Sequence, residues 1–122
     1  MDKLQALHRF WSQFNLPAYD ENAVPDDAQM PYITYEAAFS SFDEGDATLS
    51  ADLWYYSTSL TEISQKAEEI SQHLGFEGQV LKTDTGYIWV KRRSPFAQRL
   101  SDDSDPFIRR IYLSVSVEYI DY

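Results

Sequence analysis

The sequence contains no cysteine and only four glycines among its 122 residues. Without cysteine, the chain can form neither a disulfide nor a thiolate metal site. Loops that cradle phosphate need glycines close together so that backbone N–H groups can approach the phosphate, and no such group of glycines occurs here. These absences argue against a disulfide-stabilised fold and against a nucleotide-binding loop.

Long apolar runs are missing as well. No stretch of about 18 apolar residues is present, so we expect no transmembrane helix. The first residues, MDKLQALHRFWSQF, lack the apolar core and the small-residue cleavage site of a signal peptide. The sequence therefore predicts a protein that stays in the cytoplasm of the cell that makes it and has no membrane partner.

Residues that commonly carry catalysis are few. The two histidines, His8 and His73, belong to no H-x-x-x-H or H-E-x-x-H pattern. Two acidic runs, at 43–46 and 102–105, do not complete the pattern of an EF-hand loop, and short acidic turns explain both of them. Because no Ser/His/Asp set is evident either, we expect no enzyme activity, no metal ligand and no cofactor.

Positive charge is scarce and concentrated in one part of the chain. Twenty acidic and ten basic residues give a formal net charge of −10. Residues 1–53 hold ten acids and two bases, whereas residues 82–110 hold seven bases and four acids. This asymmetry indicates either a solvated surface with uneven charge or two complementary faces that meet between copies of the protein. The negative total argues against binding of a phosphate backbone as the main function.

The segment from Asp2 to Asn15 is predicted to form the first helix. Its apolar residues recur at helical spacing, and Leu16-Pro17 prevents the helix from continuing. The next residues, up to Pro31, are polar, acidic and interrupted by prolines, so we expect a loop there.

A second amphipathic helix is predicted from Ser59 to Gly75. Ser59 and Glu62 match the S-x-x-E capping box, and Gly75 can adopt the left-handed conformation that ends a helix. Five apolar residues at spacings of three and four form the face expected to be buried: Leu60, Ile63, Ala67, Ile70 and Leu74.

Alternating apolar and polar residues predict two hairpins and a final strand. The first hairpin is expected to run from Pro31 as far as Phe39, turn at 41–46 and return over 47–56. The second pairs 79–83 with 87–92, and the last strand covers 107–119. We therefore expect one α+β domain in the order α-β-β-α-β-β-β, with two helices packed on one face of an antiparallel sheet of about five strands.

The face of the sheet away from the helices is expected to carry aromatic and basic side chains. Tyrosine, tryptophan and arginine are enriched at protein interfaces, although exposed aromatics can also simply cap a small core. We favour an interface whose arginines serve assembly more than folding. Its candidate residues are Trp54, Tyr56, Arg92, Arg93, Phe96, Arg109, Arg110 and Tyr112.

Between Pro31 and Tyr119 the chain resembles the tail terminators of long-tailed bacteriophages. The resemblance rests on four stretches: PYITY, LWYYSTSLTEISQKAEEISQHL, GYIWVKRRSPFAQRL and DPFIRRIYLSVSVEY. It implies an α+β subunit of a hexameric ring at the head-proximal end of the tail, which stops polymerisation of the tail tube protein and joins the tail to the head connector. The implied location is the virion, after assembly in the host cytoplasm, and the resemblance implies no catalysis or cofactor.

Two alternatives remain open at this stage. One is another neck or minor virion protein, and the other is a cytoplasmic protein-binding adaptor unrelated to phage. A ring is expected of the virion proteins and a monomer of the adaptor. In a ring, acidic residues that face the lumen would repel DNA, so a genome would pass through without being specifically bound.

Overall fold

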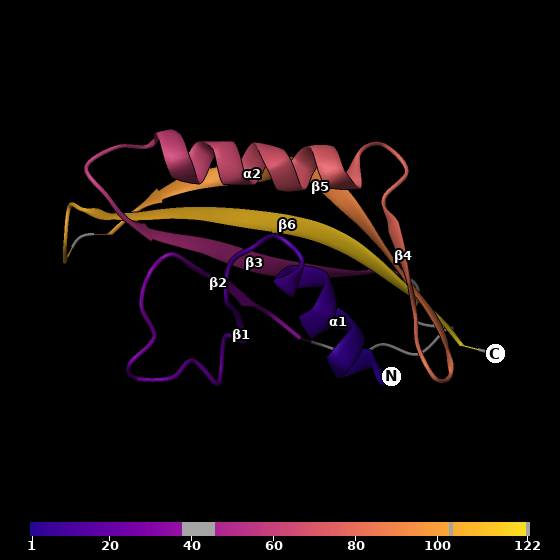
Figure 1. Ribbon diagram of the computed structural model, residues 1–122. Coiled ribbons are helices and arrows are strands. Elements are labelled where there is room, and N and C mark those ends of the chain that lie inside the picture. The colour runs from indigo at the N-terminus through magenta and orange to yellow at the C-terminus, as the bar shows by residue number, and fades with distance from the viewer. Residues whose placement is uncertain (38–45, 103, 122) are drawn as a thin grey trace.

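The computed structural model describes residues 1–37, 46–102 and 104–121, and within them two helices pack on one face of a curled six-stranded sheet (Figure 1). The predicted α+β class is confirmed, with one strand more than expected. The elements along the chain are α1 (Lys3–Ser12), β1 (Ala18–Asp20), β2 (Tyr32–Tyr35), β3 (Asp46–Tyr56), α2 (Thr61–Leu74), β4 (Gln79–Lys82), β5 (Gly86–Ser101) and β6 (Ile108–Asp121).

The sheet is mixed rather than wholly antiparallel. Its strand order is β1-β2-β3-β6-β5-β4, and every neighbouring pair is antiparallel except β1 with β2. In that pair Ala18 lies opposite Ile33 and Asp20 opposite Tyr35. The prediction of an unbroken loop from Leu16 was therefore wrong here, because a three-residue strand is too short to show alternation in the sequence.

Both predicted hairpins are present. β2 pairs with β3, and β4 pairs with the first part of β5. The expected end of the first strand at Phe39 and the turn expected to begin at Ser41 lie outside the described residues. β5 is longer than predicted: it passes through a bulge after Arg92 and pairs with β6 again from Ala97 to Ser101.

The core lies between the helices and the concave face of the sheet. The alternation in β6 is confirmed, since Ile111, Leu113, Val115 and Val117 are all buried. Four of the five predicted α2 side chains are buried too, at Ile63, Ala67, Ile70 and Leu74.

The predicted start of the second helix differs from the structure. The helix begins at Thr61, and Leu60 is 36% exposed because it precedes the first turn. Ser59 Oγ accepts a hydrogen bond from the Thr61 N–H at 3.0 Å, so the expected capping box with Glu62 is not formed. A capping box is present instead at α1, between Asp2 and Gln5.

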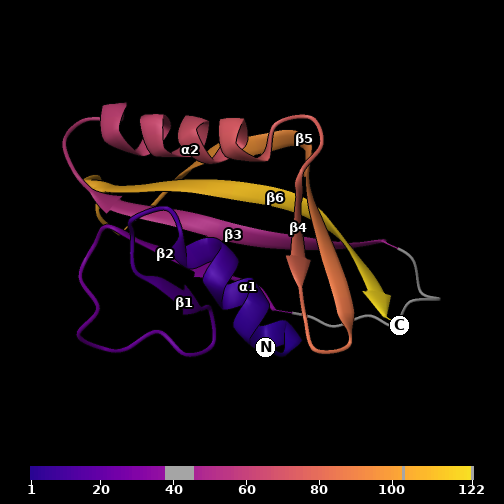
Figure 2. The same ribbon diagram turned by 45° about the vertical axis from the view of Figure 1, so that its right-hand side comes forward.

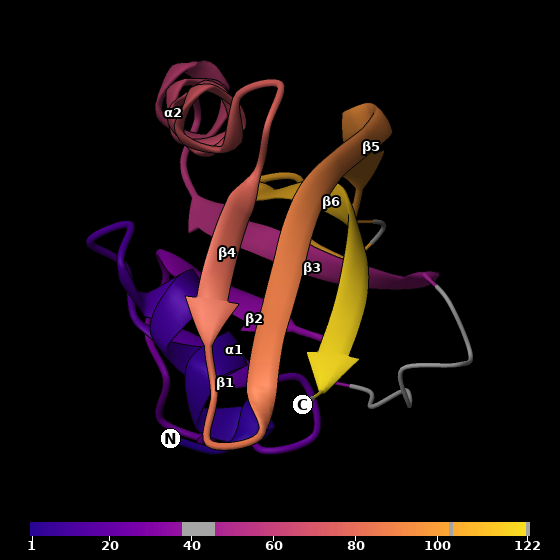
Figure 3. The same cartoon turned by 90° about the vertical axis from the view of Figure 1, so that its right-hand side faces the viewer.

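Helix α1 lies between the two edges of the curled sheet. It contacts β1 and β4, which are the outermost strands on opposite sides (Figures 2 and 3). Gln13 Nε2 donates to Gln79 Oε1 at 3.1 Å, which ties the end of α1 to β4. Lys66 Nζ donates to the Phe14 carbonyl at 2.8 Å, so α2 holds the chain that leaves α1. The sheet must therefore curl enough for one helix to reach both edges.

Candidate subunit interface

The predicted interface residues Trp54, Arg110 and Tyr112 lie together on the convex face of the sheet. Arg110 donates to Asp52 through Nε at 2.9 Å and Nη2 at 3.3 Å, and its guanidinium lies 4.8 Å from the centre of the Trp54 ring. Trp54 Nε1 in turn donates to Thr34 Oγ1 at 2.9 Å. The charge of Arg110 is thus neutralised within the subunit, and this cluster holds β2, β3 and β6 together.

Asp52 is the residue of this cluster that the sequence did not identify. Its side chain is only 10% exposed, although alternation placed it on the polar face. Its position could have identified it from the sequence, because aspartate is uncommon in the middle of a strand. The expectation that these arginines serve assembly more than folding therefore does not hold for Arg110, which satisfies a nearly buried carboxylate.

Arg92 and Phe96 lie on the other side of the sheet, next to α2. Arg92 Nη1 donates to Ser71 Oγ at 2.8 Å, and the half-buried Phe96 ring packs against the edge of the core. They line one hollow near the end of α2, and Phe96 also lines a neighbouring groove between α2 and β5, with Ala67 on the helix side and Ile111 among its lining residues. This groove follows the part of β5 that lies beyond the end of β4.

Arg93 and Arg109 reach oxygen atoms that carry no formal charge. Arg93 Nη1 donates to Thr48 Oγ1 at 2.6 Å on the convex face. Arg109 donates to the carbonyl groups of Ser57 and Thr58 at 3.1 Å each, and so braces the connection between β3 and α2. Neither guanidinium is neutralised by these contacts, so both positive charges remain available to a partner.

Tyr56 lies at the end of the sheet near the β5–β6 connection. Its side chain is 60% exposed, and its ring meets that of Phe107 edge-on with centroids 6.0 Å apart. A hydrogen bond to Asp105 raises the pKa of Tyr56, because the carboxylate favours the protonated phenol. Leu100 and Phe107 are also exposed at this end of the molecule, which gives it apolar and aromatic character.

Most basic side chains on β5 and β6 have no carboxylate partner among the residues that the structure describes. Of the six basic residues on these strands, only Arg110 forms an ion pair with a described acid. The remaining five define what we call the basic strip: Lys91, Arg92, Arg93, Arg99 and Arg109. Four of these residues lie on β5 and Arg109 lies on β6, and such a concentration of one sign of charge favours an oppositely charged partner.

Unpaired negative charge gathers on a different element. The end of β1 and the loop that follows it carry the half-buried Asp20 and the exposed Glu21, Asp26 and Asp27, none of which forms an ion pair with a described base. We call these four residues the acidic segment. One chain therefore carries two complementary groups of charge. The acidic segment lies on β1 and the loop after it, and the basic strip lies on β5 and β6.

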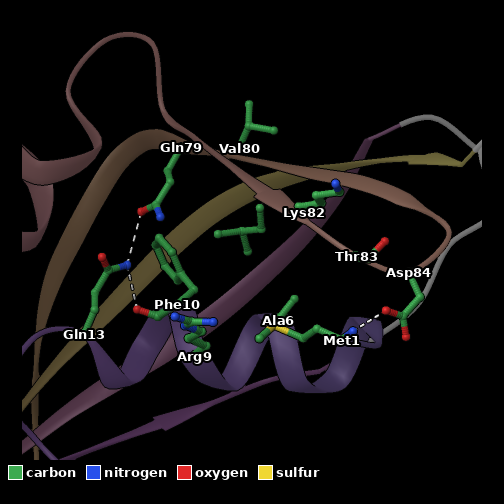
Figure 4. A pocket seen from close by; sticks show the side chains of 11 residues that line it. Met1, Ala6, Arg9, Phe10, Gln13, Gln79, Val80, Lys82, Thr83 and Asp84 are labelled. Atoms are coloured by element: carbon green, nitrogen blue, oxygen red, sulfur yellow. Dashed lines mark hydrogen bonds and ion pairs between the residues drawn. The ribbon is translucent and has the colours of Figure 1, made fainter.

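A separate hollow of about 470 Å³ lies between α1 and β4 (Figure 4). Its polar groups are largely paired with one another, since Gln13 bonds Gln79 and the Met1 amine forms an ion pair with Asp84. Arg9 and Lys82 are its basic side chains. It resembles the gap left where a helix crosses the edge of a sheet more than a site built around a ligand.

The described part of the chain contains no group of three or more His, Asp or Glu side chains arranged to hold a metal ion. Among the same residues, no helix has the length and apolar character needed to cross a membrane.

Comparisons with known proteins add no relative. No protein-family model matches the chain, and neither the curated proteins nor the solved structures give a significant match. Function is therefore inferred from the residues of this chain and from their arrangement.

Proposed function

We propose that the protein is a structural subunit that assembles with copies of itself into a ring. The observation that supports this most directly is the separation of unpaired charge between the acidic segment and the basic strip. A contact between two different patches on successive copies is heterologous, and heterologous contacts close into rings when the rotation between copies permits. Electrostatic complementarity of this kind favours correct pairing and disfavours like patches.

The more specific role that we propose is that of a phage tail terminator. The resemblance in four sequence stretches supports it, and these stretches fall on β2, on β3 and α2, on β5, and on β6. In this role a hexamer contacts the tail tube protein on one side and the head connector on the other. DNA passes through the ring without being specifically bound, and the mature location is the virion.

Solution mass and negative-stain images of the purified protein, alone and with tail tubes, test this function. We expect rings, or a monomer that forms a ring on the end of a tube. The variant Arg92→Glu/Arg99→Glu should lose assembly while remaining folded. Its matched control is Arg9→Glu/Lys82→Glu, which reverses two exposed bases outside the basic strip and should assemble normally.

A protein that stays monomeric both alone and with tail tubes would contradict the proposed function and favour the adaptor. Normal assembly by Arg92→Glu/Arg99→Glu would instead remove the basic strip from the contact. Rings that form without binding tubes would support homomeric assembly but exclude the tail terminator role.

A further inference from the structure

The outer edge of β5 is open in the described structure. β4 pairs with β5 only as far as Val90, and no described strand lies beside residues 97–101 on the side away from β6. An open strand edge presents backbone N–H and C=O groups that can pair with a strand of another chain. This edge borders the groove beside α2, so it is accessible from the surface.

Hydrogen-bond alternation identifies which groups on β5 point outward. The Ser57 N–H donates to the Phe107 carbonyl at 2.9 Å, so odd-numbered residues of β6 direct their backbone groups toward β3 and even-numbered ones toward β5. Gln98 and Leu100, which lie opposite even-numbered residues, therefore bond to β6. Ala97, Arg99 and Ser101 alternate with these two residues along β5. Their N–H and C=O groups therefore point outward, away from β6.

β1 forms the opposite edge of the same sheet. The Ile33 N–H donates to the Pro17 carbonyl at 2.8 Å, and the Glu21 N–H donates to the Tyr35 carbonyl at 2.9 Å. Because alternate residues of a strand face the same neighbour, Ala18 and Asp20 direct their backbone groups away from β2. The Asp20 carbonyl already accepts a hydrogen bond from the Ala23 N–H at 2.9 Å, so the groups that this edge offers to a partner are those of Ala18 and the Asp20 N–H. This second edge carries the first two carboxylates of the acidic segment, whereas the β5 edge carries Arg99 of the basic strip.

We propose that β1 of one subunit pairs with the outer edge of β5 in the next copy, so that the sheets of successive subunits join. The inference rests on the proposed homomeric assembly and specifies the elements that meet. Asp20 and Glu21 would then lie near Arg99 of the neighbouring copy. Two β5 edges paired symmetrically would instead bring Arg99 near its own counterpart, which like-charge repulsion disfavours.

The joined edges also suit a closed ring. Each subunit presents β1 on one side of its sheet and β5 toward the other, so every contact uses one edge of each kind. The sheet of each subunit curls, and the accumulated rotation turns successive copies around an axis instead of extending them in a straight line. Since β1 has only three residues, few backbone bonds form at each contact, and the flanking charges contribute to it.

Disulfide cross-linking tests the pairing directly, since the natural chain has no cysteine to interfere. Tyr19 on β1 and both Gln98 and Leu100 on β5 lie on the convex face, where paired strands would place their side chains side by side. Mixing Tyr19→Cys with Gln98→Cys or with Leu100→Cys should give an oxidised dimer in at least one of the two mixtures, depending on how β1 is aligned along β5. Each variant alone should remain uncross-linked, as should Tyr19→Cys mixed with the exposed α2 variant Gln72→Cys.

Cross-linking by Leu100→Cys or Gln98→Cys alone would indicate symmetric pairing and overturn the inference. Rings without any β1–β5 cross-link would also overturn it but would leave the proposed function intact. Conversely, a β1–β5 cross-link in a protein that never caps tail tubes would support the joined sheets and contradict the tail terminator role.

Proline substitution provides a second and independent test. Arg99→Pro removes an outward N–H without touching the ladder to β6, and Arg99→Thr removes the same charge but keeps that N–H. We expect Arg99→Pro to lower ring formation at least tenfold below the level of Arg99→Thr, with both variants folded by circular dichroism. Equal assembly by the two variants would show that the β5 edge is not paired.

Discussion

Arg110 and Asp52 show how one residue pair can change the role expected of a charged surface. Arg110→Ala leaves a carboxylate that is nearly buried without its partner, so the free energy of unfolding should fall by about 2 kcal/mol. Chemical denaturation measures this change. The matched control is Arg93→Ala, which loses only a contact to the exposed Thr48 hydroxyl and should change stability by less than about 0.5 kcal/mol. Equal effects of the two substitutions would mean that Asp52 does not depend on Arg110.

Tyr119 makes the stability of the fold sensitive to high pH. Burial raises its pKa to about 12, compared with about 10 for an exposed tyrosine. The folded protein therefore holds this proton more tightly than the unfolded chain. The stabilising effect is complete below about pH 10 and is lost as pH rises through about 12. Burial also raises the pKa of Tyr35 and Tyr55, so alkaline unfolding should involve all three.

Tyr119→Phe isolates this effect, because it removes the hydroxyl and keeps the buried ring. Its free energy of unfolding should decline less steeply than that of the wild type between about pH 10 and pH 12. Denaturation at a series of alkaline pH values gives both slopes. Tyr112→Phe is the control, because Tyr112 is only half-buried and lies on the convex face. Parallel curves for Tyr119→Phe and the wild type would contradict the assignment of this pH dependence to Tyr119.

At the scale of elements, helix α2 depends on its apolar face for its position on the sheet. Ile70 is fully buried, so Ile70→Asp should lower the free energy of unfolding by about 4 kcal/mol. Gln72→Asp introduces the same charge on the exposed side of the same turn, where it loses the hydrogen bond from Gln72 to Glu68 at 3.0 Å and adds a like charge beside Glu68, and it should cost only about 1 kcal/mol. Urea denaturation distinguishes the two. A small effect of Ile70→Asp would mean that this face of the helix does not pack on the sheet.

At the scale of the whole molecule, the excess of acid should prevent DNA binding by the assembled ring. Six subunits of net charge −10 carry −60 together, six times −10. Binding of a duplex needs bases that face its phosphates, and the proposed assembly places the basic strip at subunit contacts. We expect no measurable affinity for duplex DNA at about 0.15 M salt by fluorescence anisotropy. A dissociation constant below roughly 10⁻⁶ M would assign the basic strip to nucleic acid instead.

The same charges make the stability of the ring depend on salt. Contacts between exposed charges are screened as ionic strength rises, so the ring should dissociate more readily at about 1 M salt than at about 0.1 M. Analytical ultracentrifugation at fixed protein concentration measures the shift. The exposed aromatic end around Tyr56 and Phe107 offers the alternative of an apolar contact. A ring that is equally stable in high salt would favour that alternative over the basic strip.

Local periodicity in the sequence determined the elements and much of the core. The spacing of apolar residues predicted both helices, and alternation predicted the buried sides of β3 and β6, because helical and strand periods are properties of neighbouring residues. These predictions were accurate except at Asp52, which is buried in the middle of β3, and at element ends, as at Leu60, where capping depends on a few local hydrogen bonds. The positions of the basic residues in the chain were also visible, but not the direction in which each one points.

Tertiary structure decided those directions and the identity of each partner. From Arg92 to Ala97 the chain advances five positions on β5 but only two on β6, so the bulge adds an odd number of residues and reverses which side chains face α2. Likewise, the burial of Asp52 and the parallel pairing of β1 depend on residues far away in the chain. Contacts of this kind leave no local pattern, because they arise only once the sheet has curled and brought distant strands together.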